Sequence, residues 1–148
     1  MQDYPHHYPA TAKAAAEGNV TITSLGLVAL ETASPAEFGG PGDRWSPETL
    51  LVASVADCFI LTFRAVARAS KLEWSALECH VDGVLERVEK VTRFTAFKVR
   101  AVLDVPEGTN ESKAQRLLDK AERSCLITNS MTADVHLETE VRVAGLAA

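Results

Sequence analysis

The stretch that decides the fold is SPETLLVASVADCFILTFRAVARAS, residues Ser46–Ser70. Ser46 is a favourable N-cap, and Pro47 suits the first helical position, where its missing N–H costs nothing. The run at 50–63 is apolar almost all round, which predicts a helix that is buried on most of its faces. At 1.5 Å per residue this helix would be roughly 36 Å long, which is long for a small domain and indicates a partner surface.

A membrane span is the alternative interpretation of this stretch. About 20 consecutive apolar residues are needed to cross a bilayer. The apolar core at 50–63 is shorter, and Asp57 interrupts it. We therefore expect a buried helix of a soluble protein that has no membrane partner.

Length and composition favour one ordinary globular domain. The chain has 148 residues, which suits a single domain at 1–148 whose residues 1–10 form a loose polar arm. The net charge of −5 comes without a basic cluster, so we expect no nucleic-acid partner. The three cysteines are an odd number, and the N-terminus lacks a secretory signal pattern. Both observations favour the reducing cytoplasm.

The segments around the long helix predict an α+β fold. Alternating residues favour two or three short strands between 10 and 33, a hairpin of strands at 74–86 and 97–105, and a last strand at 135–143. A Gly- and Pro-rich loop at 34–44 bends the chain into the helix. A second helix begins near Thr109 or Asn110 and carries an apolar face that ends at Cys125. Hairpins combined with two helices predict a largely antiparallel sheet.

The three cysteines occupy different contexts. Cys79 lies on the apolar face of a strand, where a free cysteine is a common core residue. Cys58 lies in the middle of the long helix and Cys125 at the end of the second helix, and a pair of small buried hydrophobes would explain both. No CxxC redox motif is present, and His80 and His136 lie on polar faces. The sequence therefore predicts no metal site.

Two segments carry a resemblance to a known family. Residues 47–59, PETLLVASVADCF, resemble the reactive-cysteine motif of the OsmC/Ohr family of thiol peroxidases, and residues 121–130, AERSCLITNS, resemble its second-cysteine segment. The Gly-rich loop and the order of strands and helices are also similar, so the resemblance spans about residues 10–144. It implies the OsmC-like fold, with antiparallel sheets, a long central helix and a second helix, in an intertwined homodimer.

The resemblance implies a thiol-dependent peroxidase that reduces organic hydroperoxides. Cys58 would be the peroxidatic thiol that forms a sulfenic acid, and Cys125 would be the resolving thiol that forms a disulfide with it. Glu48 would match the family glutamate that pairs with a catalytic arginine, and Arg44 is the candidate for that arginine. No metal or other cofactor is implied. A small dithiol or a dithiol-bearing protein, such as a lipoylated one, would restore the enzyme.

The spacing of Glu48 and Cys58 adds a geometric expectation. Ten positions on a straight helix correspond to about 15 Å, so the two side chains cannot share a site within one helix. If both serve one site, Glu48 must reach Cys58 of a second subunit, as in an isologous dimer with two crossing helices. The alternative is that Glu48 only complements the positive end of the helix dipole.

Three positions depart from the family pattern. Ohr-type sequences carry the catalytic arginine in an early Gly-containing segment, whereas no arginine precedes Arg44 here, which is closer to the OsmC-like branch. Asp57 stands where the family usually has a small neutral residue, and Leu126 stands where proline is common. The changed position of the arginine keeps a second hypothesis open, a non-catalytic protein of this fold that binds a small apolar ligand or senses oxidants.

An apolar substrate pocket is expected beside Cys58, and such a pocket favours organic hydroperoxides over hydrogen peroxide. The residues expected to line it are Phe38, Trp45, Leu51, Val55 and Phe59.

Overall fold

The computed structural model describes residues 1–145, which divide into two compact units. The first unit is Met1–Leu51 and the second begins at Val52. The long helix α1, Pro47–Ala69, starts in the first unit and continues into the second.

The first unit holds a small antiparallel sheet of three strands in the order β1 (Thr11–Lys13), β2 (Val20–Thr23) and β3 (Leu30–Thr32). These are the short strands that the sequence predicts between 10 and 33. Residues 1–10 form neither helix nor strand. The described hydrophobic residues that are buried all lie outside this unit, so its sheet has no apolar core of its own.

The loop after β3 is folded tightly around a short 3₁₀ helix, η1 (Ala36–Phe38). Gly40 is required here, because a Cβ at this position would lie 1.7 Å from the carbonyl oxygen of Ser34. The loop ends in a parallel bridge between Thr32 and Trp45, and the amide of Ala33 donates to the Trp45 carbonyl oxygen at 3.0 Å. The glycines therefore return the chain to the edge of β3 immediately before α1.

The start of α1 is capped as the sequence predicts. Ser46 Oγ accepts a hydrogen bond from the Thr49 amide at 3.1 Å, and the Ser46 amide donates to Thr49 Oγ1 at 2.8 Å. This reciprocal pair satisfies an otherwise unpaired amide of the first turn. Ser46 is itself buried, so the cap is protected from water.

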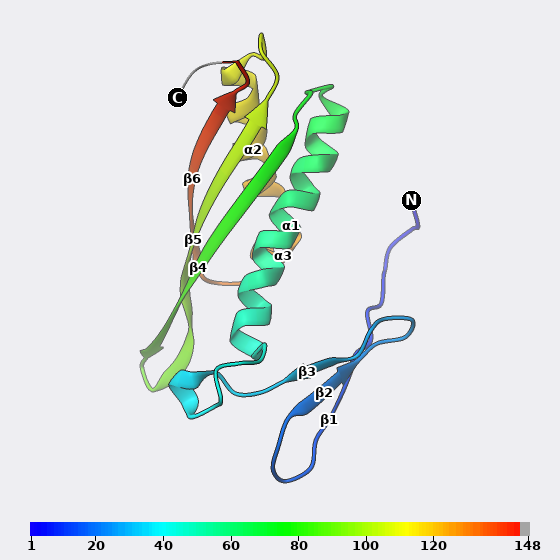
Figure 1. Ribbon diagram of the computed structural model, residues 1–148, viewed down its shortest axis with the longest axis vertical. Helices are drawn as coiled ribbons and strands as arrows, with labels where there is room; N and C mark the ends of the chain where they lie inside the picture. The colour runs from blue at the N-terminus through cyan, green and yellow to red at the C-terminus, as the bar shows by residue number, and fades with distance from the viewer. Residues whose placement is uncertain (146–148) are drawn as a thin grey trace. The chain divides into compact units, whose positions relative to one another are not determined.

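The second unit is built on a sheet of three long strands, β4 (Ala76–Val88), β5 (Val91–Val105) and β6 (Asp134–Val143), in the order β4-β5-β6. Two helices follow β5, α2 (Glu111–Ser124) and α3 (Leu126–Asn129). Asn110 caps α2 by accepting a hydrogen bond from the Lys113 amide at 3.0 Å, one of the two caps that the sequence predicts. Figure 1 shows β4 alongside the course of α1 in this unit.

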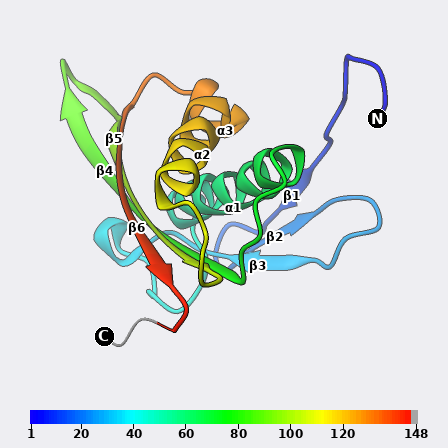
Figure 2. The ribbon, with the colours of Figure 1, turned by 90° about the horizontal axis from the view of Figure 1, so that it is seen from above.

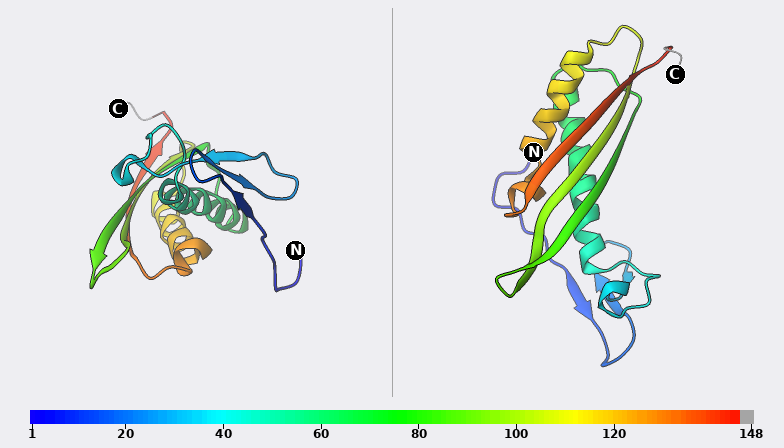
Figure 3. Two further views of the ribbon diagram at one scale, coloured as in Figure 1. Left: turned by 90° about the horizontal axis from the view of Figure 1, so that it is seen from below. Right: turned by 90° about the vertical axis from the view of Figure 1, so that its left-hand side faces the viewer.

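The helices α1 and α2 both lie on the same face of this sheet, which Figure 2 shows from above and Figure 3 from the side. The buried face of β5 alternates with exposed Lys98 and Arg100, as the sequence predicts. Its inward side chains pack beneath α2, whose apolar face is buried along its whole length. The buried residues of these two elements are Phe97, Val99, Ala101, Val102, Leu103, Val105, Ala114, Leu117, Leu118 and Ala121.

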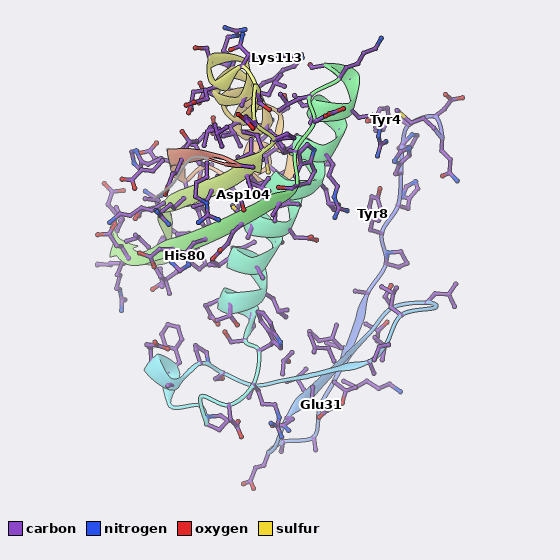
Figure 4. The ribbon with its side chains drawn as sticks, turned by 45° about the horizontal axis from the view of Figure 1, so that its top comes forward. Tyr4, Tyr8, Glu31, His80, Asp104 and Lys113 are labelled. Carbon is purple, nitrogen blue, oxygen red and sulfur yellow. The ribbon has the colours of Figure 1, made fainter. Side chains whose placement is uncertain are left out.

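Two contacts fix α1 onto this layer. Gly83 of β4 lies so close to the helix that a Cβ there would be 2.7 Å from Val52 Cγ2. At the other end, Lys113 Nζ donates to the Ser70 carbonyl oxygen at 2.7 Å, just beyond the last residue of α1 (Figure 4). A cation suits this position because the last carbonyl groups of a helix have no partner within it.

The structure corrects three details of the sequence prediction. The second unit is a mixed sheet, because β6 runs parallel to β5 and the connection between them passes through α2 and α3. The two strands of the predicted hairpin are longer than 74–86 and 97–105, since β4 and β5 continue to a tight turn at Glu89 and Lys90, which both have positive φ. Finally, α1 is buried along one stripe only, formed by Val55, Phe59, Phe63 and Ala67.

The other faces of α1 are therefore apolar and incompletely covered within one protomer. By length and composition α1 could cross a membrane, with a mean hydropathy of 1.9 over its best window, of which 22% is buried. This window extends beyond the core at 50–63. Core helices of soluble proteins have a similar length and hydropathy. A helix that a partner subunit covers is also apolar on several faces.

Candidate active site

Cys58 lies in the middle of α1, beside the buried stripe and not within it. Val55 and Phe59 flank it on the buried face, while Cys58 itself is half-buried. Its sulfur lies 3.8 Å from Oγ1 of Thr62, one helical turn further on. The Cys58 thiol is therefore partly accessible and has a hydroxyl group beside it.

Cys125 lies where α2 ends and α3 begins, and its side chain is 2% exposed. The Cys58 thiol lies near enough to Cys125 to raise the pKa of the Cys125 thiol. The fold thus brings together two cysteines that are far apart in the sequence. Cys125 lies at the end of the apolar face of α2, and Cys58 lies in the middle of α1.

The surroundings of Cys125 favour the protonated thiol. Burial raises the pKa of Cys125 above its ordinary value, while the backbone amide of Thr128 lowers it. The neighbouring Cys58 sulfur raises the pKa of Cys125 further, because it favours the form of Cys125 that keeps its proton and a second thiolate beside it would be repelled, and the Thr128 hydroxyl opposes this. The same hydroxyl donates to the Cys125 carbonyl oxygen at 3.2 Å. Cys125 is therefore a thiol at neutral pH.

Cys79 is the third thiol near this pair. It lies on the inward face of β4, opposite Ala101 of β5. Burial raises the pKa of Cys79 to about 12, and nearby Cys125 adds to the rise. The sequence predicts Cys79 as a core residue but gives no sign that it neighbours Cys125, because the two belong to different elements.

Arg44 and Glu48 belong to the first unit. Arg44 is paired with the adjacent residue, since its guanidinium lies 3.5 Å from the Asp43 carboxylate and also donates to the Asp43 carbonyl oxygen. Glu48 differs, because its Oε2 atom is buried and has no hydrogen-bond partner among the described residues. A buried carboxylate oxygen without a donor is costly, so this atom is a position where a donor from elsewhere would be stabilising.

The residues expected to line the pocket lie in different environments. Val55 and Phe59 belong to the packed core beneath α1, whereas Phe38 and Trp45 are 59% and 49% exposed. Leu51 is half-buried at the end of the first unit. Their role as pocket residues stays a prediction.

Sequence reasoning missed Thr62 and Thr128, the hydroxyl residues beside the two thiols. A signal was present in both cases. Thr62 stands four positions after Cys58 on a helix, where side chains are neighbours, and Thr128 stands three positions after Cys125. Within residues 1–145, no group of three or more His, Cys, Asp or Glu side chains is placed to hold a metal ion.

These features define the class of this protein. It is an α+β dithiol protein in which a buried thiol at the end of one helix lies near a more accessible thiol on a long apolar helix. The family model of OsmC-like proteins matches residues 40–140. The chain belongs to this OsmC-like family, as its sequence motifs predict.

Similar proteins support this assignment. The chain is 31% identical over 127 residues to an organic hydroperoxide resistance protein of Xanthomonas axonopodis pv. citri, covering 85% of this chain and 87% of that one. It is 28% identical over 129 residues to the uncharacterized protein YmaD of Bacillus subtilis, covering 85% and 81%. A solved organic hydroperoxide resistance protein OsmC of Legionella pneumophila superposes with a TM-score of 0.74 at 27% identity, covering 95% and 100%.

Proposed function

We propose that this protein is a cysteine-based hydroperoxide reductase in which Cys58 reacts with the peroxide and Cys125 resolves the product. The observation that carries this proposal is that the fold places the two thiols close enough for Cys58 to act on the pKa of Cys125. Their unequal burial supports the order of the roles, because a peroxide reaches half-buried Cys58 more readily than Cys125. The naming of family relatives for organic hydroperoxide resistance supports the substrate class.

The proposed chemistry has two steps on the protein. The Cys58 thiolate attacks the terminal oxygen of ROOH, so that an S–O bond forms, the O–O bond breaks and RO⁻ leaves to become ROH by taking a proton. The Cys125 sulfur then attacks the sulfenic sulfur, so that an S–S bond forms and hydroxide leaves, which combines with the proton of Cys125 to give water.

Turnover requires an external dithiol. It attacks the Cys58–Cys125 disulfide, restores both thiols and becomes a disulfide itself, so that two electrons and two protons pass from the dithiol to the peroxide. A dithiol small molecule or a lipoylated protein has this chemistry. No metal or other cofactor takes part in either step.

Arg44 and Glu48 complete the proposed site. An arginine beside Cys58 would stabilise the thiolate and the leaving alkoxide. Glu48 Oε2, which has no hydrogen-bond partner within residues 1–145, would accept a hydrogen bond from that arginine and hold it in place. Because Glu48 lies ten positions before Cys58 on one helix, we propose that the site forms between the two subunits of a homodimer.

The decisive experiment is a single-turnover oxidation. The reduced protein receives one equivalent of cumene hydroperoxide, and its thiols are mapped by mass spectrometry over time. A rapid Cys58–Cys125 disulfide is the expected product, and no reaction over minutes would reject the enzyme. A parallel reaction with hydrogen peroxide should be slower, and equal rates would reject the preference for organic hydroperoxides.

The function of Arg44 is tested separately from the activity itself. Arg44→Ala should slow the formation of sulfenic acid at Cys58 by about 10- to 100-fold, since a charge-assisted contact to the reacting atoms is lost. Asp43→Ala is the matched control, because it removes the present partner of Arg44 and leaves the guanidinium intact. An unchanged rate in Arg44→Ala would remove this residue from the mechanism.

A second candidate function follows from the observed pairing of Arg44 with Asp43. If Arg44 is not available to the thiols, the protein would instead bind a small apolar molecule or sense oxidants without turnover. The single-turnover experiment separates these two functions, because a binder or slow sensor does not form the disulfide within minutes of peroxide addition.

A further inference from the structure

The hydroxyl of Thr62 lies next to the sulfur of Cys58. Both side chains belong to α1, one turn apart, and their Oγ1 and Sγ atoms are separated by 3.8 Å. Residues four positions apart on a helix share a face, so this contact follows from the helix itself and needs no partner. Thr62 is half-buried, which keeps the contact partly out of water.

The direction of this hydrogen bond depends on the state of Cys58. In the thiol state either group can donate. A thiolate carries no proton, so the Thr62 hydroxyl must then donate to the sulfur. A hydrogen bond to a charged acceptor is about twice as strong as one between neutral groups, and partial burial strengthens it further. The contact therefore favours the thiolate over the thiol.

Cys125 also lies near Cys58, but it cannot replace Thr62 as a donor through the whole cycle. Its proton leaves when it attacks the sulfenic sulfur, and its sulfur then becomes part of the disulfide. The Thr62 hydroxyl keeps its proton in every state. Asp57, the acidic neighbour of Cys58 on the helix, is exposed, and a negative charge there opposes a thiolate.

We propose that Thr62 is a catalytic residue whose hydroxyl donates a hydrogen bond to the Cys58 sulfur and stabilises the reactive thiolate and the sulfenate that follows. This inference rests on the proposed peroxidase function for its role in turnover. The hydrogen bond itself is independent of that function. It supplies stabilisation from within α1, next to Cys58.

The test is the replacement Thr62→Val, which removes the hydroxyl and keeps the shape. Alkylation of Cys58 by iodoacetamide is followed across pH in the reduced protein, with the label assigned to Cys58 by mass spectrometry. Losing a hydrogen bond to a charged group should move the midpoint of the alkylation curve up by about one pH unit.

The shape of the curve distinguishes this effect from a packing defect. At pH 7 the thiolate fraction falls about tenfold, but a more basic thiolate is about threefold more nucleophilic, so alkylation slows by about threefold. At high pH, where all of Cys58 is thiolate, the rate of alkylation should be about threefold higher in Thr62→Val than in the wild-type protein. The two curves therefore cross, whereas a general loosening of the helix would raise the rate at every pH.

Two further variants serve as controls. Thr62→Ser keeps the hydroxyl and should retain the original midpoint, and Thr92→Val removes an exposed hydroxyl from β5 and should change nothing. An unchanged midpoint in Thr62→Val, or an equal shift in Thr62→Ser, would overturn the proposal. Alkylation needs no peroxide, so the result stands apart from the single-turnover experiment, whose failure would reject the peroxidase function alone.

Discussion

At the scale of single residues, burial separates three chemically identical thiols. Cys58 is half-buried on a helix, Cys125 is buried where two helices meet, and Cys79 faces inward from a strand. The thiolate is the reactive form of cysteine, and desolvation disfavours it. The reactive thiol of the pair should therefore be the one that combines access with a hydrogen-bond donor, which is Cys58.

Cys79 should be inert in the folded protein although it lies near Cys125. Because burial raises the pKa of Cys79 to about 12, only about one molecule in 10⁴ carries a Cys79 thiolate at pH 8. Alkylation at pH 8 should label Cys58 rapidly and Cys79 only after unfolding in guanidinium chloride. Cys79→Ala should leave disulfide formation unchanged, and a Cys79–Cys125 disulfide in peroxide-treated protein would contradict this prediction.

The sequence predicts which cysteines form the candidate site better than it predicts the groups that surround them. The motif around Cys58 and the apolar face that ends at Cys125 are both local patterns, and the helices form where these patterns lie. The proximity of the two thiols depends on how α2 packs over the sheet, which no local pattern predicts. Thr62 and Thr128 were missed because a threonine in a helix is ordinary until a reactive sulfur is known to lie beside it.

At the scale of elements, the position of Cys58 depends on how closely α1 approaches the sheet. Gly83 permits that approach, because a Cβ there would lie 2.7 Å from Val52 Cγ2 and 2.9 Å from Cε1 of Phe94. The pairing of β4 with β5 shifts register directly afterwards, between Val84 and Leu85, where Thr95 is the extra residue on β5. The missing side chain of Gly83 therefore lets the helix lie against β4 where a Cβ would hold it away.

Gly83→Ala should therefore lower the free energy of unfolding by about 1–3 kcal/mol, as overpacking of a core does. Denaturant unfolding at one fixed protein concentration measures this change. The double variant Gly83→Ala with Val52→Ala provides the control, because it removes the methyl group that the new Cβ meets. The two single effects should add up to more than the effect of the pair, and simple additivity would show that Val52 is not the obstacle.

The elements themselves were largely predictable, and the exceptions have physical causes. Alternation identified every long strand and placed its inward face correctly. It could not show that β6 is parallel to β5, because a strand has the same pattern in either direction. The turn at Glu89 and Lys90 was hidden because positive φ usually requires Gly or Asn, and two charged residues gave no turn signal.

At the scale of the whole molecule, one protomer leaves much apolar surface in water. In the first unit Leu25 and Val28 are 97% and 95% exposed, and the three-stranded sheet buries no apolar face. A sheet of this size needs packing partners to be stable. Along α1 only one stripe of side chains is buried. A second copy of the chain would cover such surfaces, and we expect sedimentation to give a dimer mass at micromolar concentration.

The shared site predicts more than a dimer mass, because it predicts complementation between two inactive variants. Glu48→Ala and Cys58→Ser should each lose rapid peroxide reduction. If Glu48 serves the Cys58 of its partner, a mixed dimer has one site with both residues intact and one site with neither. Random re-association of an equal mixture should then restore about a quarter of the wild-type sites, since half of the dimers are mixed. If Glu48 acts on its own helix, every site in the mixture lacks one residue and no activity returns. Peroxide consumption before and after subunit exchange measures the difference, and Cys58→Ser mixed with Cys125→Ser is the control, because a disulfide formed within one subunit should not be restored by exchange.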